Sequence, residues 1–250
     1  MKIKTILVSQ PQPSDLEKSP YADLTKKFNV NIVFRKFIKI EGIPAKEFRK
    51  DRINILDYTA VIFTSRNAVD HFFRISKEMR VEVPDTMKYF SISESTAYYL
   101  QKYVQYRKRK VFHSKESFAN LVELTKKHKT EKFLLPCSDI HKQEIANMLE
   151  ENKIQFKKAV IYRTLASDLS DLKIEDYDML VFFSPAGIKS LFKNFPKFTQ
   201  NKTTIGAFGP STAKAVVDAG LTLNVSAPSK TAPSMTLAIE QYLQNELKKK

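Results

Sequence analysis

Two stretches of this chain follow the same plan, 119 positions apart. Residues 61–73, VIFTSRNAVDHFF, and residues 180–192, LVFFSPAGIKSLF, each begin with an apolar run and turn, at a serine, into a helical pattern. Thr96 and Thr212 keep nearly the same offset, 116 positions, within SISESTAYYL and GAFGPSTAKAV. A repeat of this size predicts two similar domains, because solenoid repeats have periods of roughly 20–50 residues.

Short apolar runs alternate with helical patterns along most of the chain. The runs AVIF at 60–63 and MLVFF at 179–183 are apolar at every position, which is typical of strands covered on both faces. The alternation indicates α/β units with parallel sheets. We therefore expect an α/β fold of two flavodoxin-like parallel-sheet domains.

The second copy of the repeat stops early. Ser117 and Ser234, 117 positions apart, each begin a helical pattern, but only the first is followed by a further strand, helix and strand. The N-terminal segment has that missing strand–helix–strand plan. We therefore expect a discontinuous domain of residues 1–37 and 167–250 and an inserted domain of residues 38–166. Two strand-like crossings would join them, with a ligand cleft between them.

Four of the apolar runs end at a residue suited to begin a helix. These predicted capping residues are Ser65, Ser93, Ser184 and Gly209, and a proline follows the last two. A helix N-terminus has free backbone N–H groups and favours an anion. Corners at the carboxyl ends of parallel strands line the crevice in which open α/β sheets bind ligands. One corner alone is most simply a cap, whereas four predict a site for a polyanion.

The chain is strongly basic, with 42 Lys and Arg against 27 Asp and Glu and a net charge of +15. Such a charge suits a nucleic acid, an acidic small molecule or simply a solvated surface. No nucleic-acid motif accompanies the basic run at 107–110 or the lysines at 248–250, so we expect no nucleic-acid partner. We also expect no membrane contact, because no apolar stretch approaches the roughly 20 residues of a spanning helix.

Several kinds of site are disfavoured by the sequence. The four histidines show no metal-ligand spacing with Cys137, the only cysteine, so we expect no metal. Neither G-x-x-x-x-G-K-[ST] nor G-x-G-x-x-G occurs, so a nucleotide lacks its usual phosphate loop. A single cysteine also permits no internal disulfide, which favours a reducing, cytoplasmic location.

Six motifs, in order, carry a resemblance that covers nearly the whole chain. IFTSRNAV, LLPCSDIHKQEI, VIYRT, FFSPAGI, GAFGPSTAKAVVDAG and SAPSKTAPSMTLAI resemble the uroporphyrinogen-III synthase family. The resemblance implies a lyase of tetrapyrrole and heme biosynthesis that cyclises hydroxymethylbilane, inverting its terminal (D) ring with loss of water, to uroporphyrinogen III. It also implies no cofactor, a monomer, and transient contact with the preceding pathway enzyme. The substrate carries acetate and propionate arms on every ring, which suits a basic cleft lined with helix N-termini.

The resemblance also implies site residues. Tyr162 in VIYRT matches the family's cleft tyrosine, whose phenol could donate a proton to the departing hydroxyl, although a half-buried aromatic at the linker explains it equally well. The substrate-binding residues implied are Ser65, Arg66, Asn67, Ser93, Ser95, Thr96, Ser138, Lys142, Ser184, Pro185, Ala186, Gly187, Gly209, Pro210, Ser211 and Thr212.

Two positions depart from the family pattern. Arg66 stands where proline is common, and it would either bind a carboxylate or simply be exposed. Ser93 stands where glycine is common. The sequence leaves open a two-lobed, non-catalytic binding protein for a polyanionic small molecule and, less favoured, a basic nucleic-acid-binding protein.

Overall fold

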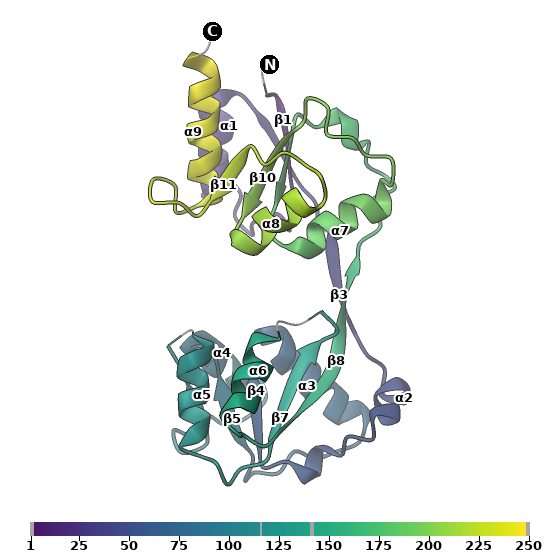
Figure 1. The fold of residues 1–250 in the computed structure, drawn as a ribbon, viewed down its shortest axis with the longest axis vertical. Helices are drawn as coiled ribbons and strands as arrows, with labels where there is room; N and C mark the ends of the chain where they lie inside the picture. The colour runs from purple at the N-terminus through teal and green to yellow at the C-terminus, as the bar shows by residue number, and fades with distance from the viewer. Residues whose placement is uncertain (1–2, 116, 141–142, 249–250) are drawn as a thin grey trace. The chain divides into compact units, whose positions relative to one another are not determined.

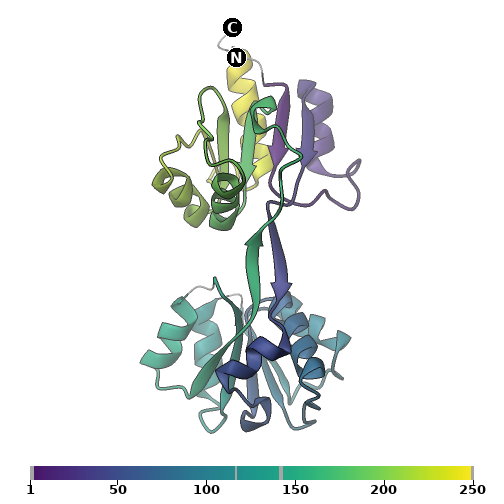
Figure 2. The same cartoon turned by 90° about the vertical axis from the view of Figure 1, so that its right-hand side faces the viewer.

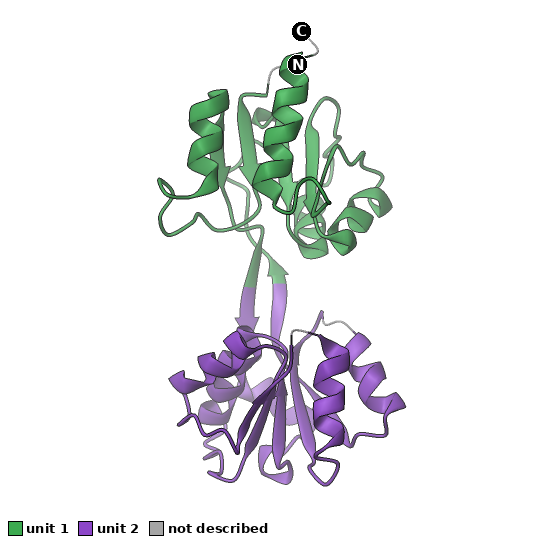
Figure 3. Ribbon diagram, turned by 90° about the vertical axis from the view of Figure 1, so that its left-hand side faces the viewer, with its two compact units in different colours: residues 1–39, 165–250 green, residues 40–164 purple. Residues whose placement is uncertain are grey.

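The computed structural model describes residues 3–115, 117–140 and 143–248. The chain forms two compact units, coloured separately in Figure 3. Unit 1 comprises residues 1–39 and 165–250, and unit 2 comprises residues 40–164. Unit 1 is discontinuous, as the early end of the second repeat predicted.

Unit 1 is built on a parallel five-stranded sheet with the order β11-β10-β9-β1-β2. Its strands are β1 (Thr5–Val8), β2 (Asn31–Phe34), β9 (Met179–Phe182), β10 (Thr204–Phe208) and β11 (Val225–Ala227). Helices α1 (Pro20–Phe28) and α9 (Met235–Lys248) cover one face, and α7 (Pro185–Asn194) and α8 (Pro210–Asp218) cover the other (Figure 1).

Unit 2 contains a six-stranded sheet with the order β3-β8-β7-β4-β5-β6. Its strands are β3 (Ile38–Gly42), β4 (Ala60–Phe63), β5 (Lys88–Ser91), β6 (Val111–His113), β7 (Phe133–Ser138) and β8 (Phe156–Ala166). Helices α3 (Arg66–Glu78) and α4 (Glu94–Tyr99) pack on one face, and α5 (Phe118–Lys126) and α6 (Glu144–Glu151) pack on the other. A short helix, α2 (Ala45–Phe48), follows β3. Strands β4 to β8 pair in parallel.

The strands β3 and β8 are the two predicted crossings. They are neighbours in the sheet and lie side by side in Figures 1 and 2. The boundaries between the units, at 39/40 and 164/165, fall inside these two strands. The chain therefore passes from one unit to the other twice, each time as a strand.

The two sheets have the same strand order once the permutation is taken into account. Without the edge strand β3 and counted from β4, unit 2 has the order 3-2-1-4-5. Counted from β9 through β11 and back to β1 and β2, unit 1 has the same order. The N-terminal segment thus supplies the last two strands of the second copy. In each sheet the order reverses beside the first strand, at β4/β7 and at β9/β1, and such a switch point is where open α/β sheets bind ligands at the carboxyl ends of their strands.

The continuous apolar runs belong to strands that are buried on both faces. In β4, Val61 and Phe63 join the core under α3, whereas Ala60 and Ile62 join the core under α5 and α6. Side chains alternate along a strand, so each layer of helices receives every second residue. This is why AVIF shows no polar position.

The basic run 107–110 forms a turn immediately before β6, and so lies at the amino-terminal edge of its sheet. Within the described ranges, no helix is long and apolar enough to cross a membrane. No group of three or more metal-ligating side chains occurs among the same residues.

Candidate active site

Two predicted corners have nearly the same geometry in the two units. Ser65, before α3, and Ser184, before α7, both have extended backbones, with φ/ψ of −163°/161° and −157°/153°. The Ser65 Oγ accepts the Ala68 N–H at 3.1 Å, and the Ser184 Oγ accepts the Gly187 N–H at 3.3 Å. Both serines are therefore N-caps, as predicted, and each holds the free end of a helix at the carboxyl end of a central strand.

The other two corners differ from each other. Ser93, before α4, has φ −142°, and its Oγ accepts the Thr96 N–H at 3.3 Å. Gly209, before α8, has φ +88° and no side chain with which to cap the helix. A positive φ is costly for residues with a Cβ, so glycine is required at this corner and serine is suitable at the other.

The two threonines of these corners lie beneath the surface. Thr96 and Thr212 are 5% and 1% exposed. The Ser93 Oγ lies 3.1 Å from the Thr96 Oγ1 and also 3.1 Å from the Ser95 Oγ. Both threonines therefore lie on the inner side of their corners.

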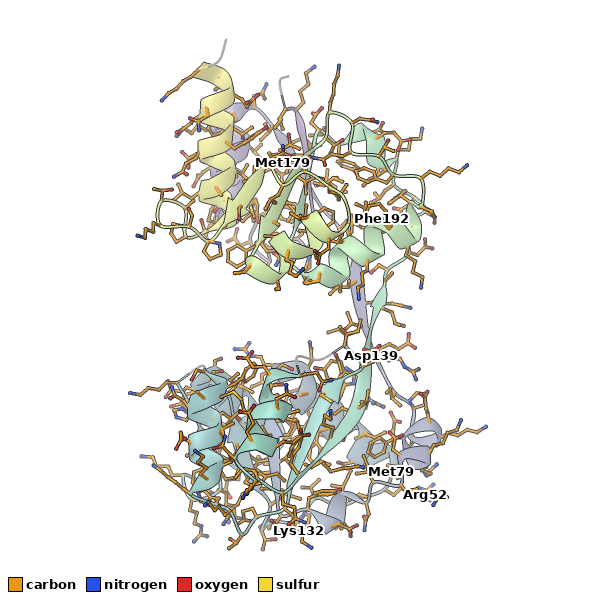
Figure 4. All side chains as sticks on the ribbon, in the orientation of Figure 1. Arg52, Met79, Lys132, Asp139, Met179 and Phe192 are labelled. Atoms are coloured by element: carbon orange, nitrogen blue, oxygen red, sulfur yellow. The ribbon has the colours of Figure 1, made fainter. Side chains whose placement is uncertain are left out.

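Tyr162 lies on β8, close to the switch point of unit 2. It pairs in register with Ser138 of β7, just after a shift of register between Cys137 and Ser138, and its carbonyl accepts the Asp139 N–H at 3.1 Å. The Asp139 Oδ1 accepts the Thr164 N–H at 3.0 Å, which ties β7 and β8 together at the position labelled in Figure 4. The backbone around Tyr162 is therefore fixed from both strands.

The Tyr162 phenol meets the first corner of its own unit. Its Oη lies 3.4 Å from the Ser65 Oγ, and its side chain is buried, with 8% of the residue exposed. Burial raises the pKa of this phenol, and the Ser65 hydrogen bond opposes that rise only in part. The phenol is thus protonated at neutral pH and can donate a hydrogen bond.

The remaining predicted residues differ in accessibility. Arg66 and Asn67 in the first turn of α3, and Pro210 and Ser211 in that of α8, are exposed. Pro185 and Ala186 in the first turn of α7 are half-buried. Ser138 is buried and donates from its Oγ to the Ile140 carbonyl at 2.6 Å. Lys142 lies outside the described residues.

Gly187 allows close packing inside its own unit. A Cβ at this position would come within 3.3 Å of the Phe182 ring and 3.7 Å of the Ser9 Oγ. Ser9 follows β1, and its N–H donates to the Val181 carbonyl at 2.9 Å. The first turn of α7 therefore packs closely against the switch-point side of its own sheet.

A family model described as uroporphyrinogen-III synthase HemD matches residues 19–236, most of the chain. The chain belongs to the uroporphyrinogen-III synthase family. It is accordingly a lyase of tetrapyrrole and heme biosynthesis. Enzymes of this family act on hydroxymethylbilane and form uroporphyrinogen III. Among curated protein sequences, none matches the chain.

Two solved structures show the same fold over almost their whole length. The uroporphyrinogen-III synthetase of Helicobacter pylori is 18% identical, with a TM-score of 0.60, and the match covers 97% of this chain and 100% of the other. A mutant uroporphyrinogen III synthase of Thermus thermophilus is 15% identical, with a TM-score of 0.58 and coverage of 97% and 99%. At such identities the likeness supports the two-unit α/β fold, and the family assignment depends on the family model.

Sequence reasoning missed two contacts and one positional correspondence in the synthase's candidate site. His71 stacks on Tyr162, with ring centroids 5.0 Å apart and planes 20° apart. The Arg66 guanidinium lies over the Tyr99 ring, 5.4 Å from its centroid. Ser9, just after β1, corresponds in the permuted order to Ser138 at the end of β7, and only this correspondence had a sequence signal.

A large cavity lies away from this site. It has a volume of about 890 Å³ and lies in unit 1, where its lining includes Asp178 and Thr203, the residues just before β9 and β10. This is the amino-terminal edge of the sheet, opposite the helix N-termini. It therefore does not coincide with the candidate site.

Proposed function

We propose that Tyr162 is the acid that assists departure of the terminal hydroxyl of hydroxymethylbilane. The observation that carries this proposal is the buried, protonated phenol beside Ser65 at the switch point of unit 2. Transfer of its proton to the hydroxyl would release water and leave a cationic carbon on the bilane. On ring closure, the carbon that forms the new bond would lose a proton, and this proton would restore the phenol. Cyclisation would therefore release one water in total.

The helix N-termini would bind the substrate's carboxylates. Arg66 and Asn67 are exposed in the first turn of α3, where backbone N–H groups and the helix dipole favour an anion. The first turns of α7 and α8 would do the same in unit 1. Ser138 and Lys142 remain proposed substrate ligands, and the buried Thr96 and Thr212 would act from the inner side of their corners.

Most of these residues would bind rather than react. After the hydroxyl leaves, the cationic carbon must be attacked at the substituted position of the last ring, giving a spiro intermediate that fragments and recloses. An enzyme that holds the cation and its nucleophile in one geometry removes much of the entropic part of that barrier. This proposal needs no cofactor.

Incubation with freshly prepared hydroxymethylbilane tests the activity. The expected product is the inverted isomer, uroporphyrinogen III, formed faster than the uninverted isomer arises spontaneously. If only the uninverted isomer accumulates while the protein still binds the tetrapyrrole, the chain is a binding protein for a polyanion. Nucleic-acid affinity that exceeds tetrapyrrole affinity and falls steeply with salt would favour the third class of function.

We also propose that the enzyme acts as a cytoplasmic monomer that contacts the preceding enzyme of the pathway only transiently. The buried, unpaired Cys137 is compatible with a reducing compartment. Size-exclusion chromatography with light scattering, alone and with the preceding enzyme added, tests the oligomeric state. A stable dimer or a co-eluting complex would contradict it.

A further inference from the structure

The ring of His71 packs against the ring of Tyr162. Neither the repeat nor the family resemblance predicts this contact. His71 lies in α3 and Tyr162 in β8, 91 positions later, and their rings are nearly parallel at 5.0 Å. The opposite end of the phenol reaches Ser65, the cap of the same helix, at 3.4 Å. One helix therefore holds Tyr162 at both its ring and its hydroxyl.

His71 is in turn held by Arg74, one turn further along α3. The Arg74 Nε–H donates to the His71 Nδ1 at 3.1 Å. Its other guanidinium nitrogens donate to the carbonyls of Ile43 and Ile161, both at 2.9 Å, and to the Glu78 carboxylate at 2.6 Å. Because Ile161 precedes Tyr162 in β8, the arginine connects the histidine to the strand that carries the phenol.

The space for this guanidinium depends on a glycine. A Cβ at Gly42 would come within 2.5 Å of the Arg74 Cζ, far closer than atoms can approach. Gly42 ends β3, whose neighbour is β8. Arg74 is thus fixed by four hydrogen bonds and by close contact with the backbone of Gly42.

This arrangement determines which nitrogen of His71 carries the proton. An arginine Nε–H can only donate, so the His71 Nδ1 must accept and the proton must be on Nε2. Protonation of the ring would place an Nδ1–H against the Nε–H and a positive charge beside the guanidinium. The His71 ring therefore stacks on Tyr162 in its neutral form.

The charged groups around His71 favour the same form. Burial lowers the pKa of His71 below its ordinary value near 6.5, and Arg74 lowers it further. The carboxylates of Asp70 and Glu78 oppose this shift. Asp70 accepts hydrogen bonds from Tyr99, Lys102 and Tyr103, and Glu78 pairs with Arg74, so both are already engaged.

We propose that His71 is a positioning residue for Tyr162, with Arg74 holding its imidazole in the Nε2–H form so that the neutral ring supports the phenol in the orientation that faces Ser65. The inference rests on the proposed role of Tyr162 as the acid. His71 itself transfers no proton to the substrate. Protonation of His71 breaks the contact with Arg74, releases the ring from Tyr162 and leaves the phenol misaligned.

The kinetic test uses two substitutions of His71. His71→Ala removes the ring, and we expect kcat to fall on the order of 10-fold or more with KM little changed, because small displacements of a reacting group have large effects on rate. His71→Phe keeps a stacking ring that cannot be protonated, and should recover part of the rate and lose the acid limb that His71 contributes to the pH profile of kcat. Equal kcat for His71→Ala and wild type, at matched free energies of unfolding, would overturn the proposal.

Gly42→Ala tests the contact between Arg74 and His71 without changing the ring of His71 or of Tyr162. The new methyl group should displace the Arg74 guanidinium and shift kcat in the same direction as His71→Ala. His113→Ala is the matched control, because His113 is an exposed histidine on β6, and its kcat and pH profile should equal those of wild type.

A spectroscopic measurement separates failure of this inference from failure of the acid role. The ring resonances of Tyr162, assigned by their loss in Tyr162→Phe, should titrate in wild type with a midpoint below about 6.5 and remain flat in His71→Phe. If Tyr162→Phe retains full turnover but this titration is seen, the acid role is wrong and the positioning contact stands. If Tyr162→Phe is slow but no titration is seen, His71 does not position Tyr162.

Discussion

The hydroxyl oxygens of Ser65 and Tyr162 lie 3.4 Å apart, although the residues are 97 positions apart in the chain. The Ser65 oxygen already accepts the N–H of Ala68, so this one serine caps α3 and contacts the phenol of β8. A residue of the helix corner and the candidate acid therefore share one site. In the proposed mechanism, the contact would connect anion binding at the helix N-terminus to proton donation beside it.

Tyr162→Phe should slow turnover more than it weakens product binding. The ring and its stacking on His71 are kept, while the proton donor is lost. General acid assistance typically contributes about 10²–10⁴-fold, whereas one lost hydrogen bond weakens binding by only about 1 kcal/mol. Single-turnover kinetics and equilibrium binding of uroporphyrinogen III measure the two effects. Unchanged turnover would mean that Tyr162 serves only in packing.

Ser65→Ala is the companion change. It keeps the phenol and removes both the cap and the phenol's partner, so it should lower the free energy of unfolding by about 1 kcal/mol. Its effect on kcat should be smaller than that of Tyr162→Phe. A larger effect on kcat than that of Tyr162→Phe would indicate that Ser65, and not Tyr162, donates the proton.

Thr212→Val should weaken the use of substrate without unfolding the protein. Thr212 lies in the first turn of α8 and is 1% exposed, so valine fills the same space and removes only the hydroxyl. We expect a several-fold loss in kcat/KM, on the scale of one lost hydrogen bond of about 1 kcal/mol. Thr222→Val, at an exposed position before β11, is the control. Wild-type kinetics for Thr212→Val would contradict its assignment to the site.

The fold could be predicted from the sequence because its signals are local and repeated. In the two predicted apolar runs, residues 60–63 and 179–182 form buried strands, and the serines that follow these runs cap helices. The offset of the repeat, with its missing end, predicted that the N-terminal segment completes the second copy. Each of these inferences needs only a few neighbouring residues and one comparison along the chain.

The contacts inside the candidate site could not be predicted in the same way. His71 and Tyr162 stack because α3 packs on the sheet beside β8, and nothing in the sequence near either residue indicates the other. The near-complete burial of Thr96 and Thr212 depends equally on packing within each unit. The sequence predicted which corners belong to the site, and the structure shows which side chains are accessible there.

Gly209→Ala should destabilise the protein through its backbone. Gly209 has φ +88°, and an added Cβ would have no heavy atom within 4 Å, so the cost does not come from crowding. With ψ 149° as well, this backbone conformation is essentially confined to glycine, and it costs a residue with a Cβ on the order of 1–3 kcal/mol. Urea unfolding measures the change.

The matched control is Gly206→Ala, in β10. There a Cβ would lie 3.5 Å from Val181, an ordinary van der Waals contact, and the backbone φ is not positive. A smaller loss of stability is expected than for Gly209→Ala. Equal losses would mean that backbone conformation is not what selects glycine at the α8 corner.

The stability of the protein should fall as the pH drops below neutrality, in part because of His128. Its ring packs on Phe112 and Phe90, with centroids 4.7 and 5.1 Å apart, and burial together with Lys88 lowers its pKa. Between this lowered pKa and the ordinary value near 6.5, the unfolded chain binds a proton that the folded chain does not. The contribution is therefore complete above that ordinary value and is lost as the pH falls through it towards the folded pKa.

His128→Leu should remove this share of the acid sensitivity. Urea unfolding at about pH 7.5 and about pH 5 should show a smaller loss of stability for the variant than for wild type. His113→Leu, at an exposed position, should leave the difference unchanged. The same loss in His128→Leu as in wild type would exclude His128 as a source of it.

The thiol of Cys137 should be inert in the folded protein. It is 4% exposed at the end of β7, and burial raises its pKa to about 11, with Lys158 opposing the shift only partly. Only about one molecule in a thousand would carry the reactive thiolate at pH 8, and the sulfur is also sterically shielded. Ellman's reagent should therefore react slowly with native protein and stoichiometrically in urea. Rapid modification of the folded chain would show that the β7 end opens, and with it the strand pairing that fixes Tyr162.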